Sequence, residues 1–75
     1  MSDRDYIRAS LAKNRLTHVW MIYQLHLCGI ETEKTEFSSV LAGTRKGEKA
    51  ESIILNAVQI LDAYEQYWIE RVTAI

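Results

Sequence analysis

The chain has 75 residues, of which 48% are hydrophobic and 25% are charged, and its net charge is −1. This length and composition predict one folded domain over residues 1–75 and exclude an intrinsically disordered chain. A domain of this size buries only about 60% of the surface that its unfolded chain exposes, so we expect it to gain stability from a second copy.

The residue types also limit the fold class and the compartment. The chain has no proline and three glycines, and no alternating apolar and polar run is bounded by turn residues, so the prediction is an all-α protein. The longest apolar stretch, Val19 to Tyr23, is far shorter than the roughly 20 residues of a membrane span. Cys28 is the single cysteine, and no apolar leader with a cleavage site opens the chain, so we expect a cytoplasmic protein.

The first helix is predicted over residues 3–13. Ser2, followed three residues later by Asp5, is typical of a helix start, where a side chain accepts a hydrogen bond from a free backbone amide. Ile7 and Leu11 lie one turn apart and form the buried side of this helix.

The second helix is predicted from Thr17 to Leu27. Threonine is a residue type that caps helices, and Gly29 can end the helix because glycine adopts the left-handed backbone conformation without a steric cost. Between them the chain is apolar around most of the helix circumference. We therefore expect a central helix that other elements cover on several sides.

A short third helix of about two turns is predicted before Gly43, with Thr35 as its cap. Phe37, Val40 and Leu41 have the i, i+3, i+4 spacing of a buried helical side. The opposite side then shows four polar residues, which are Lys34, Thr35, Ser38 and Ser39.

The last helix is predicted over about residues 48–74, because apolar residues keep helical spacing from Ala50 to Val72. Three short helices cannot cover this length. We therefore expect the far end to contact its counterpart in a second subunit. The predicted dimer contacts are Leu61, Tyr64, Trp68, Ile69 and Val72.

The sequence carries no pattern that predicts catalysis or metal binding. His18 and His26 lie about two turns apart on one helix, too distant to share a metal without a third ligand. His26 and Cys28, two positions apart, point to different sides of a helix. No glycine-rich phosphate loop or nucleophile elbow occurs. We therefore expect a protein without enzymatic activity, metal, cofactor or small-molecule substrate.

The second and third helices and their connecting turn have the order of a DNA-binding helix-turn-helix over about residues 17–43. Such a unit lays one helix across the phosphate backbone and inserts a short second helix into the major groove, which is about 12 Å wide. Small polar side chains suit the groove, and basic loop residues and helix N-termini suit phosphates. The predicted DNA-binding residues are Thr17, His18, Lys34, Thr35, Ser38, Ser39, Thr44, Arg45, Lys46 and Lys49.

A longer pattern resembles a known family. It comprises Leu16-Thr17, the Trp20-Met21-Ile22 cluster, Leu25, Gly29-Ile30, Phe37-Ser38-Ser39-Val40-Leu41 and Gly43-Thr44-Arg45-Lys46-Gly47. Over about residues 5–62 the chain is similar to the lambda-repressor/Cro-like helix-turn-helix proteins of phages and prophages. The resemblance implies a four-helix domain with a long C-terminal helix, which regulates transcription as a homodimer on double-stranded DNA at the nucleoid. It also implies two groups of DNA contacts: a recognition helix with Lys34, Thr35, Ser38 and Ser39, and a following loop with Arg45 and Lys46.

The charges leave two alternatives open. Residues 1–49 carry eight basic and six acidic side chains, and residues 50–75 carry one basic and four acidic, which favours an anionic partner for the N-terminal half. Glu31, Glu33 and Glu36, however, would repel phosphates if they faced DNA. One alternative is therefore a protein-binding module, such as an antirepressor or inhibitor, that grips another protein through these glutamates without binding DNA. The other is a purely structural dimeric bundle.

Overall fold

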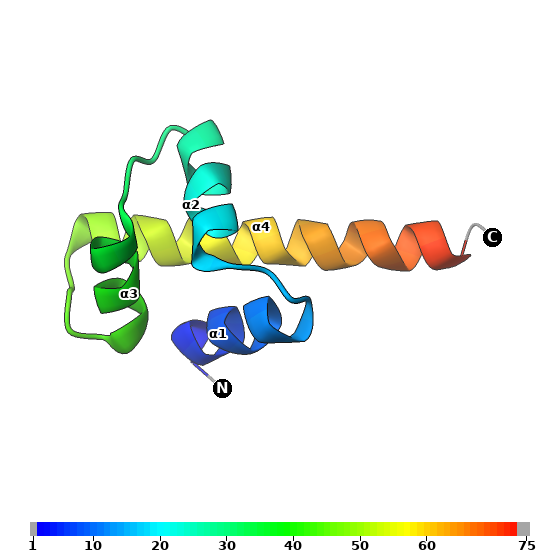
Figure 1. Cartoon of the computed structure of the whole chain (residues 1–75), viewed down its shortest axis with the longest axis horizontal. Coiled ribbons are helices and arrows are strands. Elements are labelled where there is room, and N and C mark those ends of the chain that lie inside the picture. The colour runs from blue at the N-terminus through cyan, green and yellow to red at the C-terminus, as the bar shows by residue number, and fades with distance from the viewer. Residues whose placement is uncertain (1, 74–75) are drawn as a thin grey trace.

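Four helices make up the described part of the chain. The computed structural model describes residues 2–73, and the side chains of residues 2–67. The helices are α1 (Asp3–Lys13), α2 (His18–Leu27), α3 (Lys34–Ala42) and α4 (Glu48–Thr73), and no strand occurs within residues 2–73. Figure 1 shows α4 as one long rod, with α1, α2 and α3 grouped around its N-terminal part and its C-terminal end extending beyond them. The predicted all-α class and the four predicted helices are confirmed.

The start of α1 has the predicted cap. The Ser2 side chain accepts a hydrogen bond from the Asp5 backbone N–H at 3.2 Å and donates one to the Asp5 carboxylate at 2.9 Å. After the end of the helix, Arg15 has a φ of 57°, a left-handed conformation that costs roughly 1–2 kcal/mol in a residue with a Cβ. The Leu16 N–H then bonds to the Leu11 carbonyl at 2.8 Å, which turns the chain toward α2.

The ends of α2 also follow the prediction. The Thr17 hydroxyl accepts a hydrogen bond from the Trp20 backbone N–H at 3.0 Å. At the other end Gly29 has a φ of +86°, and the Ile30 N–H bonds to the Leu25 carbonyl at 2.9 Å. This pattern satisfies carbonyls that the helix leaves open and requires a left-handed residue, which explains the glycine.

The predicted cap of α3 is wrong. The helix begins at Lys34, its cap position is Glu33, and the Glu33 side chain makes no capping hydrogen bond. The first turn is closed when the Glu33 carbonyl accepts a hydrogen bond from the Phe37 N–H at 2.8 Å. Thr35 therefore lies exposed within the first turn of the helix and does not occupy the cap position.

One core joins all four helices. Phe37, Val40 and Leu41 are buried as predicted. The remaining core residues are Ile7 and Leu11 of α1, Met21 and Leu25 of α2, and Ala50, Ile53, Ile54, Ala57 and Leu61 of α4. Together they hold α3 against α1 and α4. Core packing therefore fixes the position of this helix, although it has only nine residues.

Two of the predicted dimer contacts have partners within the chain. Leu61 is fully buried in the core, so its side chain stabilises the monomer. Tyr64 packs edge-to-face on Trp20 with ring centroids 5.6 Å apart. Trp68, Ile69 and Val72 lie outside the residues whose side chains are described.

Two arginines of α1 hold the end of α3. The Arg4 Nε donates to the Val40 carbonyl at 2.8 Å, and the Arg8 Nη1 donates to the Leu41 carbonyl at 3.0 Å. The last carbonyls of a helix carry partial negative charge, so a guanidinium group stabilises them. These arginines contribute to the basic excess of the N-terminal half, but their role here is structural.

A polar network joins α1 to α4. The buried Ser10 hydroxyl donates to a Glu65 carboxylate oxygen at 3.0 Å, and the Asn14 amide donates to the same oxygen at 3.1 Å. The hydrogen bonds from Asn14 and then Ser10 hold the pKa of Glu65 below its usual value. The Tyr6 hydroxyl donates to the Asp62 carboxylate, which raises the pKa of Tyr6 to about 12.

Candidate functional site

The N-terminus of α2 and the first turns of α3 form a polar edge. Thr17, His18 and Lys34, together with Val19, line a hollow of about 480 Å³. The His18 ring stands edge-on to Phe37 at 5.1 Å, and its Nδ1 lies 3.4 Å from the Ser38 hydroxyl. The structure therefore brings together four of the sequence-predicted site residues, and we call Thr17, His18, Lys34 and Ser38 the polar edge.

The outer side of α3 bears small polar side chains. Thr35 and Ser38 are exposed, and Ser39 is half-buried. Ala42 completes this side as a small exposed residue. Nothing bulky on these positions hinders the close approach of another molecule along the helix.

The loop after α3 is held against the helix end. Gly43 has a φ of +83°, and the Ser39 carbonyl accepts hydrogen bonds from the Thr44 hydroxyl at 3.2 Å and the Arg45 N–H at 3.3 Å. The side chains of Thr44, Arg45 and Lys46 are exposed. This geometry keeps the loop residues at a constant position relative to α3.

Glu36 binds two of the predicted basic contacts. Its carboxylate accepts a hydrogen bond from the Thr32 hydroxyl at 2.6 Å, and it lies 3.0 Å from the Lys49 Nζ and 3.4 Å from the Arg45 Nη1. The side chain is only 14% exposed. The hydrogen bond from Thr32, followed by that from Lys49, lowers the pKa of Glu36. The carboxylate therefore remains charged and offsets the charge of both cations.

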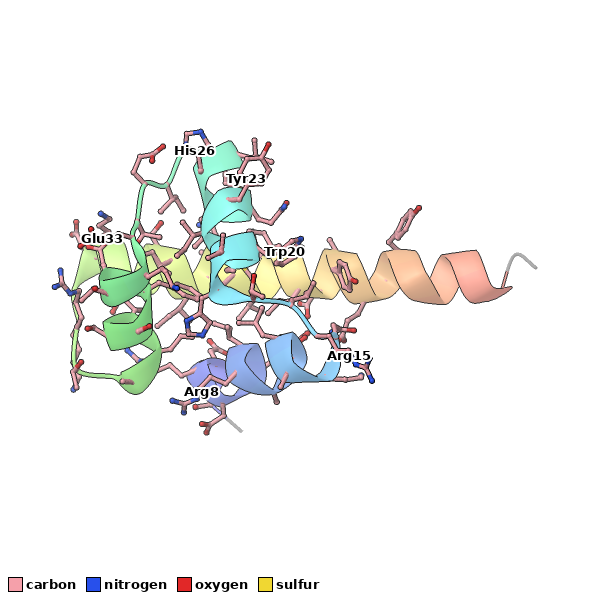
Figure 2. The ribbon with its side chains drawn as sticks, in the orientation of Figure 1. Arg8, Arg15, Trp20, Tyr23, His26 and Glu33 are labelled. Carbon is pink, nitrogen blue, oxygen red and sulfur yellow. The ribbon has the colours of Figure 1, made fainter. Side chains whose placement is uncertain are left out.

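The two other glutamates of this region lie nearby. Glu31 contacts the Nδ1 of His26, and Glu33 is exposed, with no polar partner for its side chain among the described residues. Figure 2 shows Glu33 at the start of α3 and His26 at the far end of α2. A second hollow of about 350 Å³ is lined by Glu31, Thr32, Glu33, Glu36, Arg45 and Lys49, which we call the acidic edge.

The two edges lie on opposite sides of α3. A helix turns about 100° per residue, so Glu36 projects roughly 200° around the axis from Lys34. Lys49, predicted as a site residue with Lys34, belongs instead to the acidic edge. The sequence contains a local signal for part of this arrangement, because Thr32 and Glu36 are spaced i, i+4. The contact between Glu36 and Lys49 is tertiary and has no such signal.

No constellation for metal binding is found within the described part of the chain. No three side chains of His, Cys, Asp or Glu converge there. His18 lies against Phe37 and Ser38 at one end of α2, and His26 lies beside Tyr23 near the other. Cys28 is exposed and unpaired by any disulfide. A search of the described helices for a stretch long and apolar enough to cross a bilayer finds none.

One side of α2 exposes apolar side chains, which the sequence did not predict. We expected this helix to be covered on several sides, but Val19, Tyr23 and Leu27 are exposed. The reason is that α2 packs chiefly on α3 and α4, and its buried side is limited to Met21 and Leu25. The sequence signal is the absence of Asp, Glu, Lys and Arg from α2.

No protein-family model, curated protein or solved structure matches the chain. Function is therefore inferred from the residues and their arrangement.

Proposed function

We propose that the chain is a sequence-specific DNA-binding regulator of the lambda-repressor/Cro-like type, in which α2 and α3 act as the helix-turn-helix. The observation that carries the proposal is the polar edge. Thr17 and His18 at the N-terminal end of α2 lie together with Lys34 and Ser38 in the first two turns of α3, and the N-terminal ends of the helices meet DNA in such units. The acidic residues lie on the other side of α3.

In this proposal the contacts divide into two groups. The N-terminus of α2, with Thr17 and His18, faces a phosphate, since free backbone amides and the helix dipole favour an anion there. The outer side of α3 enters the major groove, where Lys34 contacts a guanine and the small hydroxyl side chains contact neighbouring bases. Arg45 and Lys46 approach the sugar-phosphate backbone and contribute affinity without reading sequence.

The protein binds as a homodimer, so that two copies of α3 reach half-sites in successive major grooves. It has no catalytic role and represses or activates by occupying its site. The length of α4 and the small size of the core support association.

The alternative of a protein-binding module depends on free glutamates. Glu36 is neutralised by Lys49 and Arg45, and Glu31 contacts His26. Of these three glutamates, only Glu33 has no hydrogen-bond or ion-pair partner for its side chain among the described residues. Because Glu36 and Glu31 already have partners within the chain, the structure favours the DNA-binding function over binding of another protein through these glutamates.

Fluorescence anisotropy with a random duplex, at low and moderate salt, tests the proposal. We expect salt-sensitive binding, because log K falls by about 0.9 per phosphate contact for each log unit of salt. Arg45→Ala and Lys46→Ala should weaken binding to every sequence and reduce this slope. Lys34→Ala and Ser39→Ala should change which bases a selected duplex pool contains, with about 1–3 kcal/mol of discrimination for each base contact.

Lys13→Ala is the matched control, since Lys13 is an exposed lysine of α1 outside both edges. Absence of salt-sensitive binding by the unmodified protein at low ionic strength would contradict DNA binding. An equal loss on all sequences for all four site variants would contradict the division of roles.

A further inference from the structure

His18 and Ser38 join the two helices of the proposed helix-turn-helix. His18 is the first residue of α2, and its Nδ1 lies 3.4 Å from the hydroxyl of Ser38 on α3, 20 positions away in the chain. The His18 ring packs on the buried Phe37 side chain, with ring centroids 5.1 Å apart, which fixes its position. Ser38 is exposed, so its hydroxyl can contact the ring and an incoming molecule at the same time.

The Ser38 hydroxyl has one hydrogen to donate and two lone pairs that accept. Its role toward a third group therefore depends on whether Nδ1 of His18 carries a proton. If Nδ1 is bare, Ser38 donates its hydrogen to the ring, and only its lone pairs remain for another molecule. If Nδ1 carries a proton, Ser38 accepts from the ring, and its own hydrogen is free for another molecule.

The phosphate contact proposed for His18 determines which form is present in a neutral complex. Phosphate oxygens accept hydrogen bonds from the protein, so the ring nitrogen that faces the phosphate must carry a proton. Because Nδ1 faces Ser38, that nitrogen is Nε2. A neutral imidazole carries a single proton. Nδ1 is therefore bare in the neutral complex, and Ser38 donates to it.

We infer that His18 sets the hydrogen-bonding role of Ser38 in the major groove, and that protonation of His18 reverses this role and changes the preferred base. With neutral His18, Ser38 presents an acceptor, which matches the amino group of cytosine. With protonated His18, Ser38 presents a donor, which matches the acceptors of guanine or thymine. His18 is thus a positioning residue for base recognition. This inference rests on the proposed DNA-binding function and names how its specificity is regulated.

The charges around the ring couple its protonation to DNA binding. Lys34 of α3 lines the same hollow as His18, and within the described part of the chain neither α1 nor α4 contributes a lining residue to it. The N-terminus of α2 adds partial positive charge. A phosphate bound here is therefore the negative group that favours the protonated ring. The other histidine, His26, contacts the carboxylate of Glu31 instead.

Selection of duplexes from a random pool at about pH 5.5 and about pH 7.5 tests the inference, because histidine is the side chain that ordinarily titrates in this range. The chain has two histidines, so His26→Gln is the matched control for His18→Gln. The base position that Ser38 reads is the one whose preference is lost in Ser38→Ala. At that position, acidification should lower the ratio of cytosine to guanine and thymine by about fivefold or more.

The unmodified protein and His26→Gln should show this change, whereas His18→Gln should select the same base at both pH values. Ser38→Ala should lose the preference but still bind more tightly at the lower pH. Its salt slope should then be steeper by about 0.9, since protonated His18 adds one charge that faces a phosphate. Circular dichroism verifies that the variants keep the same helix content.

Ring ¹⁵N chemical shifts of the unmodified protein, bound to its selected duplex, show which nitrogen of His18 carries a proton. We expect a bare Nδ1 at the higher pH and protons on both nitrogens at the lower pH. A protonated Nδ1 at both pH values would overturn the inference. So would a change of base preference that persists in His18→Gln or disappears in His26→Gln.

Failure of this inference can be distinguished from failure of the proposed function. Salt-sensitive binding with the same base preference at both pH values keeps the DNA-binding function and removes the role of His18. Absence of salt-sensitive binding at either pH removes the DNA-binding function, and the inference falls with it.

Discussion

The polar edge and the acidic edge of α3 differ in charge, although Lys34 and Glu36 are only two positions apart in the sequence. Lys34 has no carboxylate partner among the described residues, whereas Glu36 binds Thr32, Lys49 and Arg45. A short helix can thus present a cationic side chain on one side and an ion-paired carboxylate on the other. Three glutamates close in sequence to a proposed DNA contact do not by themselves exclude it.

Basic residues that are equivalent in a count of charges also differ between the two edges. Arg45 and Lys49 each lie beside the carboxylate of Glu36, so a phosphate must compete with that carboxylate for them. Lys34 meets no such competition. The difference predicts that Glu36 lowers the affinity for DNA of any sequence while leaving the contribution of Lys34 unchanged.

The largest loss of stability is expected from removing the Phe37 side chain, which anchors α3 in the core. Phe37 is fully buried, with His18 packed against its ring, so Phe37→Ala should destabilise the fold by about 3–5 kcal/mol. Urea denaturation followed by circular dichroism measures this loss. Thr35→Ala, on the exposed side of the same helix, should change stability by less than about 0.5 kcal/mol. Similar values for the two variants would show that α3 is not anchored through Phe37.

Glu36→Gln should change the contribution to DNA binding of the acidic edge and leave that of the polar edge unchanged. With the carboxylate neutralised, Arg45 and Lys49 contact phosphates without competition from Glu36, so affinity for a random duplex at low salt should rise by about tenfold. The salt slope should steepen by about one to two contacts. Anisotropy titrations at several salt concentrations measure both quantities.

Glu33→Gln is the control, because it makes the same charge change one turn earlier without removing a described ion pair. If both variants raise affinity equally, net charge alone is responsible. If neither does, the acidic edge does not affect DNA binding.

A smaller effect is expected in the dependence of stability on pH. The pKa of Glu36 is lower in the folded protein than its ordinary value of 4.5, so its contribution is present above that value and is lost as pH falls through the folded pKa. The contribution should be below about 1 kcal/mol. Urea midpoints measured between neutral and acidic pH should therefore fall less steeply for Glu36→Gln than for the unmodified protein. Glu33→Gln is again the control, since it removes no described ion pair, and an equal flattening by both variants would contradict the assignment to Glu36.

The features that depend on neighbours in the sequence could be predicted. Ser2 and Thr17 cap their helices through amides three residues on, and Gly29 and Gly43 have the positive φ expected after a helix. The predicted cap of α3 is wrong because capping preference favours threonine over glutamate, whereas Glu33 occupies the cap position without a side-chain hydrogen bond.

The features that depend on distant residues could not be predicted. Arg4 and Arg8 bind carbonyls 36 and 33 residues away, and the sequence shows them only as basic residues. Lys49 lies 13 positions after Glu36, and no periodicity joins the two. The exposure of Tyr23 and Leu27 likewise follows from the packing of α2 chiefly on α3 and α4, which the sequence of α2 does not contain.

The sequence by itself determined the starts of α1 and α2, and it determined that Phe37, Val40 and Leu41 are buried, because caps and periodic apolar residues act over one turn of chain. Only the tertiary structure decided that Glu36 pairs with Arg45 and Lys49 while Lys34 stays apart, and that one side of α2 is left uncovered. Those outcomes depend on how four helices pack around one core, since side chains far apart in the chain meet only when that core has formed.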